Sequence, residues 1–265
     1  FPDVVIALGK VKSRFLIKSL QKYEKLTYRG SDALTVLSKD LEENVSNKIS
    51  SMRIPPKVEV IPNFLISESI KPQSRYTKYR EEYELGEKLV VMYAGNLGNS
   101  QSFELMIKAA ENHEKREDVI YVINGSGVMS ETLKDKATEL RNLKVIDYQP
   151  IKRLSEVLAT ADIHIVPLRT GLGHMSVPSK IYSVFAAGRP VLASVDSETE
   201  IERIIRASGA GIAVQPDDFN SFRDRLEELI ENSELREEMG NKARIWLEKW
   251  YSPEVIAGSY LDLVQ

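Results

Sequence analysis

From residue 88 onward, short apolar runs rich in β-branched residues alternate with segments of helical periodicity. This alternation is typical of a parallel sheet with helices on both faces, because parallel strands need a long crossover between them. The predicted strands are 89–93, 119–123, 143–146, 163–166, 191–193 and 211–214. The predicted crossover helices are 102–114, 130–140, 152–160, 178–187 and 198–207, and Ser102 is the expected cap of the first. We therefore predict one doubly wound α/β domain.

The residues before 70 follow a different pattern. They predict a basic amphipathic helix at 12–29, a strand at 33–37, a helix at 40–49, a strand at 58–61 and a polar linker or hinge at 67–78. A βαβ unit of about 70 residues cannot cover both faces of its own sheet. We therefore expect residues 1–70 to be the last part of a first domain, whose earlier strands lie upstream. Residues 71–251 form the second domain, with charged helices at 218–232 and 233–249, and a last helix occupies 252–265.

Composition excludes several classes of protein. Lys and Arg total 36 against 39 Asp and Glu, so a net charge of −3 gives no overall attraction to nucleic acid. The absence of cysteine excludes disulfides and thiolate chemistry, and His113, His164 and His174 lack the spacing of a metal site. No apolar run is long enough to span a bilayer, and the start at Phe1 does not resemble a signal peptide. We expect a cytoplasmic globular protein that begins inside a longer chain.

The segment 174–193 predicts a loop, a short apolar helix, a stop at Gly188 and a strand. Pro178 suits the first turn of a helix, and Ser176 or Ser179 can cap its free amides. Lys180 lies in that first turn, where the helix dipole disfavours a cation unless an anion is close. The segment is therefore a candidate seat for a phosphate group.

Four further loops follow the predicted strands, at 94–100, 124–127, 147–150 and 167–173. Ligands of open α/β sheets bind outside the carboxyl ends of the strands, so a nucleotide could lie across all four loops. The alternative is structural. The glycines of the first two loops can serve only to turn the backbone, and Tyr148 and Gln149 can simply mark the end of a strand.

The predicted helix at 12–29 carries most of a basic segment interleaved with apolar residues. Its cations are Lys10, Lys12, Arg14, Lys18, Lys22 and Lys25. This pattern is found in ordinary solvated surface helices, and also in faces that meet anionic lipid headgroups or a phosphorylated acceptor.

Eight short motifs occur in a fixed order along the chain. They are Ser38 after a strand, Val60-Ile-Pro-Asn63, Tyr93-Ala-Gly-Asn-Leu-Gly98, Asn124-Gly-Ser-Gly127, Ala161-Asp-Ile-His-Ile-Val-Pro167, Pro178-Ser-Lys-Ile-Tyr182, Ala187-Gly-Arg-Pro-Val191 and Gly209-Ala-Gly-Ile212. In this order the chain resembles the retaining GT-B glycosyltransferases of family 4, above all the bacterial enzymes of O-antigen, capsule and exopolysaccharide synthesis. The resemblance implies two Rossmann-like domains facing across a cleft. The first is only partly present here, and the last helix crosses back to it.

The resemblance also implies a reaction and a site. A hexosyl or N-acetylhexosaminyl group would pass from a nucleoside-diphosphate sugar to a saccharide or lipid-linked acceptor hydroxyl. No metal or cofactor would take part, and the enzyme would be cytoplasmic or peripheral at the inner face of the membrane. Lys180 is the implied catalytic residue, stabilising the leaving diphosphate, and the fragment alone would be inactive. The implied donor-binding residues are Gly95, Asn96, Leu97, Gly98, Gln101, Gly125, Gly127, Tyr148, Gln149, His174, Ser176, Ser179, Lys180, Ser183 and Glu200.

The chain departs from the family pattern at two pairs of positions. Many members carry two glutamates where this chain has Met175 and Ser183, and an arginine and a lysine where it has Asn96 and Gln101. Either these roles pass to Lys180, Gln101 and the Glu198/Glu200 region, which we favour, or activity has been lost. The rival interpretations are a sugar-nucleotide 2-epimerase of GT-B fold and an inactive sugar-nucleotide-binding module.

Overall fold

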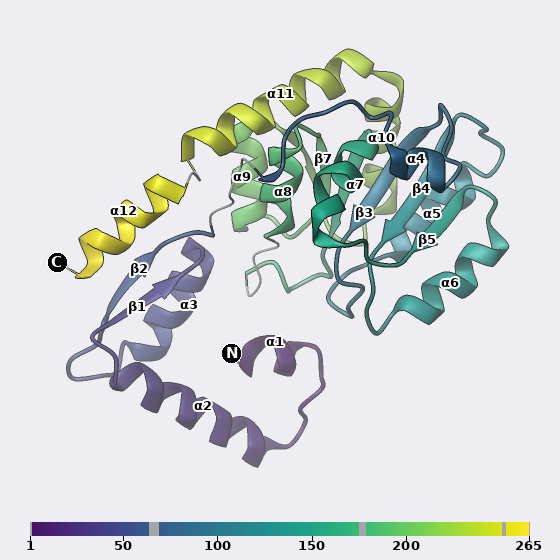
Figure 1. Ribbon diagram of the computed structural model, residues 1–265. Coiled ribbons are helices and arrows are strands. Elements are labelled where there is room, and N and C mark those ends of the chain that lie inside the picture. Colours follow the sequence, from purple (N-terminus) through teal and green to yellow (C-terminus); the bar gives the residue numbers. More distant parts are fainter. Residues whose placement is uncertain (1, 64–68, 175–178, 251–252, 265) are drawn as a thin grey trace.

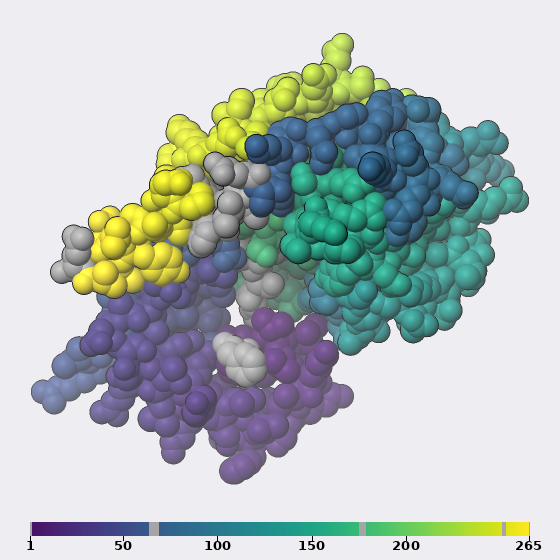
Figure 2. Space-filling view, viewed as in Figure 1, coloured from purple at the N-terminus to yellow at the C-terminus, as the bar shows by residue number. Residues whose placement is uncertain are grey.

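The computed structural model describes residues 2–63, 69–174, 179–250 and 253–264 and divides into two units (Figure 1). The first unit consists of α1 (Pro2–Ala7), α2 (Arg14–Arg29), β1 (Ala33–Val36), α3 (Lys39–Ile49) and β2 (Lys57–Val60). Its two strands pair in parallel, as the predicted βαβ unit requires. Figure 2 shows the unit as a lobe of its own beside the larger second unit.

Serine side chains fix where the two long helices of the first unit begin. The Ser13 hydroxyl accepts a hydrogen bond from Leu16 N, and the Ser38 hydroxyl accepts one from Leu41 N. Each serine satisfies a backbone N–H that has no partner inside the helix. The short helix α1 was not predicted from the sequence.

The second unit contains all six strands predicted after residue 88. Its elements are α4 (Lys78–Glu82), β3 (Leu89–Ala94), α5 (Glu104–Asn112), β4 (Val119–Asn124), α6 (Ser130–Glu139), β5 (Leu143–Ile146), η2 (Ile151–Arg153), α7 (Leu154–Thr160), β6 (Ile163–Pro167), α8 (Lys180–Ala186), β7 (Val191–Ser194), α9 (Glu200–Ser208), β8 (Gly211–Val214), α10 (Phe219–Glu231) and α11 (Ser233–Trp250). The last helix of the chain is α12 (Pro253–Val264). None of the helices in the described ranges is both long and apolar enough to cross a bilayer.

The six strands form one parallel sheet in the order β5-β4-β3-β6-β7-β8. From β3 the chain moves to β4 and β5 on one side, then returns to place β6 on the other side of β3. The register of that central pair sets Val91 opposite Ile163. The topological switch point therefore lies between β3 and β6, where open α/β sheets bind their ligands.

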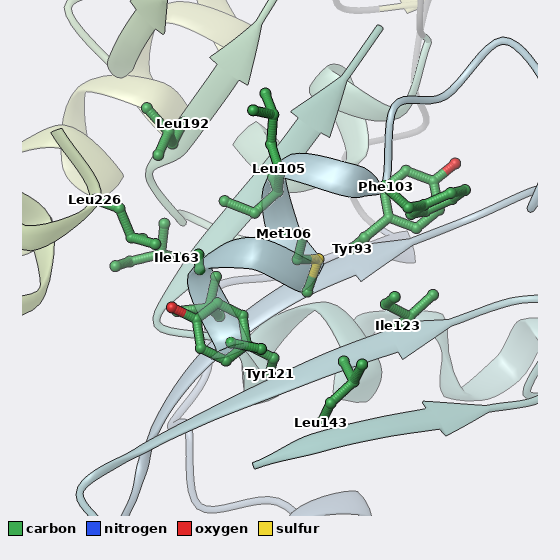
Figure 3. Packing of buried hydrophobic residues seen from close by; sticks show 14 of the residues in the cluster. Tyr93, Phe103, Leu105, Met106, Tyr121, Ile123, Leu143, Ile163, Leu192 and Leu226 are labelled. Atoms are coloured by element: carbon green, nitrogen blue, oxygen red, sulfur yellow. The ribbon is translucent and has the colours of Figure 1, made fainter. Parts of the chain in front are cut away.

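Both faces of the sheet are buried, which explains why the strands read as continuous apolar runs. On β3, Val91 and Tyr93 pack into the core shared with α5 and α10, whereas Val90 and Met92 face the opposite side, towards α4 and α7. Figure 3 shows the first of these cores, in which Tyr93 lies beside Phe103. The end of β3 is thus held rigidly where the switch point lies.

The predicted Ser102 cap is wrong, and of the two alternative caps predicted for α8, Ser179 does not serve. Helix α5 begins at Glu104 and has no side-chain cap, because the Ser102 hydroxyl donates to the Glu104 carboxylate instead. Helix α8 begins at Lys180, and Ser179 precedes it without making a capping hydrogen bond. The predicted start at Pro178 and the predicted Ser176 cap lie outside the described residues.

The predicted hinge is also wrong for residues 69–77, which pack against the second unit. Ile70 is 2% exposed in the core beneath α8, and Arg75 Nη1 donates to Asp162 Oδ1 over 2.6 Å. The remaining hinge residues before 69 include masked positions outside the described ranges, and α4 was not predicted. At the other end of the chain, Figure 1 shows α12 on the side of the molecule where β1 and β2 lie.

Candidate functional site

Two glycine loops lie in direct contact at the carboxyl ends of β3 and β4. Gly95 N donates to Asn124 O over 2.8 Å, and Leu97 N donates to Ser126 O over 3.0 Å. A Cβ on Gly125 would overlap Gly95 O, and one on Gly127 would overlap Leu97 O. These close approaches explain the glycines of the second loop structurally, and Leu97 is fully buried between the loops.

Lys180 lies over the first of these loops. Its Nζ donates to Tyr93 Oη over 2.6 Å and stands 4.7 Å from the centre of the Tyr93 ring. A Cβ on Gly95 would overlap the end of the Lys180 side chain, so the glycine makes room for the cation.

Burial lowers the pKa of Lys180 to about 8, and no carboxylate contributes to its environment among the described residues. A buried cation without a counter-charge costs free energy, so such groups are frequent at functional sites. The position of Lys180 therefore suits the capture of an anion.

Next to Lys180 is a pocket of about 270 Å³. It brings together five of the sequence-predicted site residues, Gly95, Tyr148, Gln149, Lys180 and Ser183. The rest of its lining comes mainly from apolar residues of η2, α7 and α8, namely Ile151, Leu154, Val157, Leu158 and Val184. An apolar wall with a few polar groups at its edge fits an aromatic ring such as a nucleobase.

The polar residues of this pocket are held in place by hydrogen bonds. Gln149 Nε2 donates to Tyr83 Oη over 3.0 Å, while its Oε1 accepts from Arg153 Nη1 over 2.9 Å. Asn124, which the sequence analysis did not select, also lines the pocket and donates to Asp147 O over 2.8 Å. Its position at the end of β4, directly before the Gly-Ser-Gly run, could have indicated a site residue. By contrast, Tyr148 is 54% exposed, so a ring could stack on it.

Hydrogen bonds between neutral groups hold the loop after β3, residues 94–101, in shape. Gly98 N donates to Gln101 Oε1 over 2.9 Å, and Asn96 O accepts from Tyr93 Oη over 2.7 Å. Gln101 also lines a small cavity of about 20 Å³ together with Tyr93 and Lys180. Residues 94–101 contain no cation. Arg169 donates from Nε to Asn99 O over 2.9 Å, but its charge is paired with Glu104. Lys180 therefore brings to this loop a positive charge for which no carboxylate partner is found among the described residues.

His174 and Glu200 belong to another cluster, which joins the two units. His174 Nδ1 lies 3.4 Å from Asp40 Oδ1, and Glu200 N donates to Asp40 Oδ2 over 2.7 Å. Arg203 pairs with both Asp40 and Glu200. Neither His174 nor Glu200 lines the Lys180 pocket. The sequence reasoning missed Asp40 and Arg203 because their contact spans distant parts of the chain.

A six-stranded parallel sheet, glycine loops at the carboxyl ends of β3 and β4, and a smaller βαβ unit define an α/β architecture with two Rossmann-like units. Solved structures agree on the fold. Anabaena HepE in complex with UDP-glucose superposes with a TM-score of 0.74 at 14% identity, covering 90% of this chain and 65% of that one. WaaG, a glycosyltransferase of lipopolysaccharide biosynthesis, superposes with a TM-score of 0.73 at 15% identity, covering 99% and 71%.

The family itself follows from the sequence comparison. Residues 76–246 match the family described as Glycosyl transferases group 1, and the chain belongs to this family. The probable glycosyltransferase WbjE of Pseudomonas aeruginosa is 26% identical over 235 residues, which cover 87% of this chain and 58% of WbjE. The putative colanic acid biosynthesis glycosyl transferase WcaI of Escherichia coli K12 is 28% identical over 138 residues, 51% of this chain and 34% of WcaI.

The chain therefore spans 58% or less of these two relatives. Their names favour neither of the rival interpretations, the 2-epimerase and the inactive binding module.

Proposed function

We propose that this chain carries the donor side of a retaining glycosyltransferase of surface polysaccharide or glycolipid biosynthesis. The enzyme transfers a hexosyl or N-acetylhexosaminyl group from a nucleoside-diphosphate sugar to a hydroxyl of a saccharide or lipid-linked acceptor. The observation that carries the proposal is Lys180, a partly buried cation with no carboxylate partner among the described residues, placed beside an apolar pocket at the carboxyl ends of β3 and β4. Membership of the glycosyltransferase family supports it.

Each part of the donor has a proposed place. The base lies in the pocket against Tyr148 and beside Gln149, and Ser183 offers a hydroxyl to the ribose. The diphosphate lies at Lys180 and Gly95, where a cation and a glycine loop allow a phosphate to approach closely.

In the proposed reaction, the bond between the anomeric carbon and the diphosphate oxygen breaks, and its electron pair leaves with the diphosphate. The acceptor oxygen bonds to the anomeric carbon on the face that the diphosphate leaves, and its proton passes to an oxygen of the departing diphosphate. Lys180 opposes the negative charge that grows on the departing diphosphate, which is the largest electrostatic demand of such a transfer. Because its pKa is about 8, Lys180 is mostly protonated at pH 7. We propose that this chain performs that task without a metal or cofactor.

Calorimetric titration of the chain with UDP-glucose, GDP-mannose and dTDP-glucose tests the donor assignment. We expect saturable binding of at least one of them; binding of none would overturn the proposal. Tyr148→Ala should weaken the binding about tenfold by removing a stacking surface. Tyr260→Ala, which removes a similarly exposed tyrosine from α12, is the matched control and should leave the affinity unchanged.

We further propose that α2 contacts an anionic membrane surface. Its exposed side carries Phe15 at 82% and Tyr23 at 73% exposure, together with Leu26 at 57%. Lys18, Lys22, Lys25 and Arg29 line a groove along the same helix. Aromatic and aliphatic groups insert at the headgroup level of a bilayer, while cations near an anionic surface contribute about 1 kcal/mol each.

Sedimentation with vesicles tests this contact. The chain should sediment with phosphatidylglycerol-containing vesicles and not with pure phosphatidylcholine, and Lys18→Glu with Lys22→Glu should release it. Lys115→Glu with Lys152→Glu makes the same charge change at two exposed lysines of the second unit and should leave binding intact. Equal loss in both double variants would contradict a specific role of α2.

A further inference from the structure

We propose that Tyr93 is a positioning residue that holds the Lys180 ammonium over Gly95. Lys180 then provides the first glycine loop with the positive charge that many family members carry at the positions of Asn96 and Gln101. This inference rests on the proposed function, because the cation matters only where a diphosphate binds.

The hydrogen bonds of Tyr93 give its hydroxyl a fixed direction. The hydroxyl carries one proton, which it donates to Asn96 O over 2.7 Å. Its lone pairs therefore remain to accept from Lys180 Nζ, which stands 2.6 Å away. Burial also raises the pKa of Tyr93, so the hydroxyl stays neutral and does not cancel the charge of the lysine.

The ring of Tyr93 is itself immobilised. It is 3% exposed, and Phe103 packs edge-on against it with ring centres 5.0 Å apart. Figure 3 shows the two rings side by side in the core beneath α5. A side chain locked in this way provides a rigid platform, and the Lys180 ammonium lies 4.7 Å from the centre of its ring.

Gly95 completes the arrangement. Any side chain there would overlap Lys180 Cε and Nζ, so the glycine keeps open the space through which the lysine reaches the loop. An ammonium group has three N–H donors, of which Tyr93 takes one. No other acceptor of Lys180 is found in the part of the chain that the structure describes, which leaves two donors for phosphate oxygens at the loop between β3 and α5.

The alternative is that Tyr93 is only a core residue. Tyr121 provides the comparison, because it lies on the neighbouring strand β4, belongs to the same core and is fully buried. Its hydroxyl pairs with His113 Nδ1 over 2.8 Å and has no contact with Lys180. Tyr121→Phe therefore removes a buried hydroxyl from the same core without removing a contact of Lys180.

The experiment measures UDP, GDP and dTDP affinity by calorimetry in the complete chain, and the variants are then compared with whichever nucleotide binds the wild type. Tyr93→Phe keeps the ring and the Phe103 contact but removes the acceptor, and we expect affinity to fall about tenfold, the worth of one hydrogen bond to a charged group. Tyr121→Phe should bind as the wild type does. Asn96→Arg, which places a cation in the loop at an exposed position, should restore the affinity of Tyr93→Phe.

A second pair of variants tests the same point if Tyr93→Phe fails to fold. Lys180→Met should weaken binding, and adding Asn96→Arg to Lys180→Met should recover most of the loss. Wild-type affinity in Tyr93→Phe, or failure of Asn96→Arg to rescue binding in a folded variant, would overturn the inference. If the wild type binds none of the three nucleotides, the proposed function fails instead, so the two failures are distinguishable.

Discussion

Asp40 of α3 and Arg203 of α9 form an ion pair with Oδ1 and Nη2 2.7 Å apart, across 163 positions of sequence. The Asp40 carboxylate is 5% exposed and also accepts the backbone N–H of Glu200 over 2.7 Å. A buried carboxylate with two donors from another unit ties the βαβ unit to the sheet domain. The same carboxylate lies 3.4 Å from His174 Nδ1.

Asp40→Ala should therefore lower the free energy of unfolding by about 2 kcal/mol, because Arg203 and Glu200 N each lose an acceptor. Urea denaturation followed by tryptophan fluorescence measures the change. Glu59→Ala is the matched control, since it breaks the exposed pair with Lys57 at 3.7 Å and should cost no more than about 0.5 kcal/mol. Equal effects of the two substitutions would refute the role of Asp40.

Asp162 is the centre of a second buried network. Its Oδ1 accepts from Arg75 over 2.6 Å, and its Oδ2 accepts from Val90 N over 2.8 Å and from Arg80 over 3.3 Å. Asp162→Ala leaves Arg80 buried without its carboxylate, so we expect a loss of about 3–5 kcal/mol in thermal or urea unfolding. Asp118→Ala, at the exposed pair with Arg116, should cost less than about 1 kcal/mol. A loss below that limit for Asp162→Ala would show that the network is dispensable.

Gly125 lies where a side chain has no room. Gly125→Ala would drive Cβ into Gly95 O, so the two glycine loops must separate and nucleotide binding should be lost. Gly258→Ala in α12 is the control, because no atom lies near its Cβ and alanine favours a helix by about 1 kcal/mol over glycine. Nucleotide titration and thermal unfolding of both variants provide the readouts, and unchanged binding in Gly125→Ala would disprove the loop contact.

The lowered pKa of Lys180 predicts a pH dependence of binding. UDP affinity should be nearly constant below pH 8 and fall as pH rises through about 8, because the ammonium loses its proton. A bound anion favours the charged form, so the midpoint in the complex should lie above that in the free protein. Calorimetry from pH 7 to 9.5 should show this decline in the wild type and a flat profile in Lys180→Met.

The lowered pKa of Lys180 also makes the free energy of unfolding depend on pH, and this dependence has the opposite sign to that of binding. Between about pH 8 and 10.5, the ordinary pKa of a lysine, the unfolded chain retains a proton that the folded chain has lost. The contribution of Lys180 to the free energy of unfolding therefore rises with pH in that window. Denaturation of the wild type and Lys180→Met across the window measures it, and parallel curves would contradict the assignment.

The sheet was predictable because buried parallel strands leave continuous apolar runs, as Leu89–Ala94 illustrates. The glycine loops were predictable because they follow those strands directly. Contacts between distant residues were not, since Asp40 carries no local signal of its pairing with Arg203. The predicted Ser102 cap was wrong because the Ser102 hydroxyl donates to the Glu104 carboxylate and does not accept from a backbone N–H. The contact between Lys180 and Tyr93 was likewise not predictable, because it joins α8 to β3 across 87 positions of sequence.

We propose that Lys180 holds the donor diphosphate, and titration of UDP, GDP or dTDP, whichever binds the wild type, into Lys180→Met tests this most directly. Methionine keeps the length and packing of the side chain and removes the charge. We predict a loss of affinity of about 10- to 100-fold, the worth of one charged hydrogen-bonding contact. Lys134→Met, at a half-exposed lysine of α6, should bind as the wild type does. Wild-type affinity in a folded Lys180→Met variant would contradict the account.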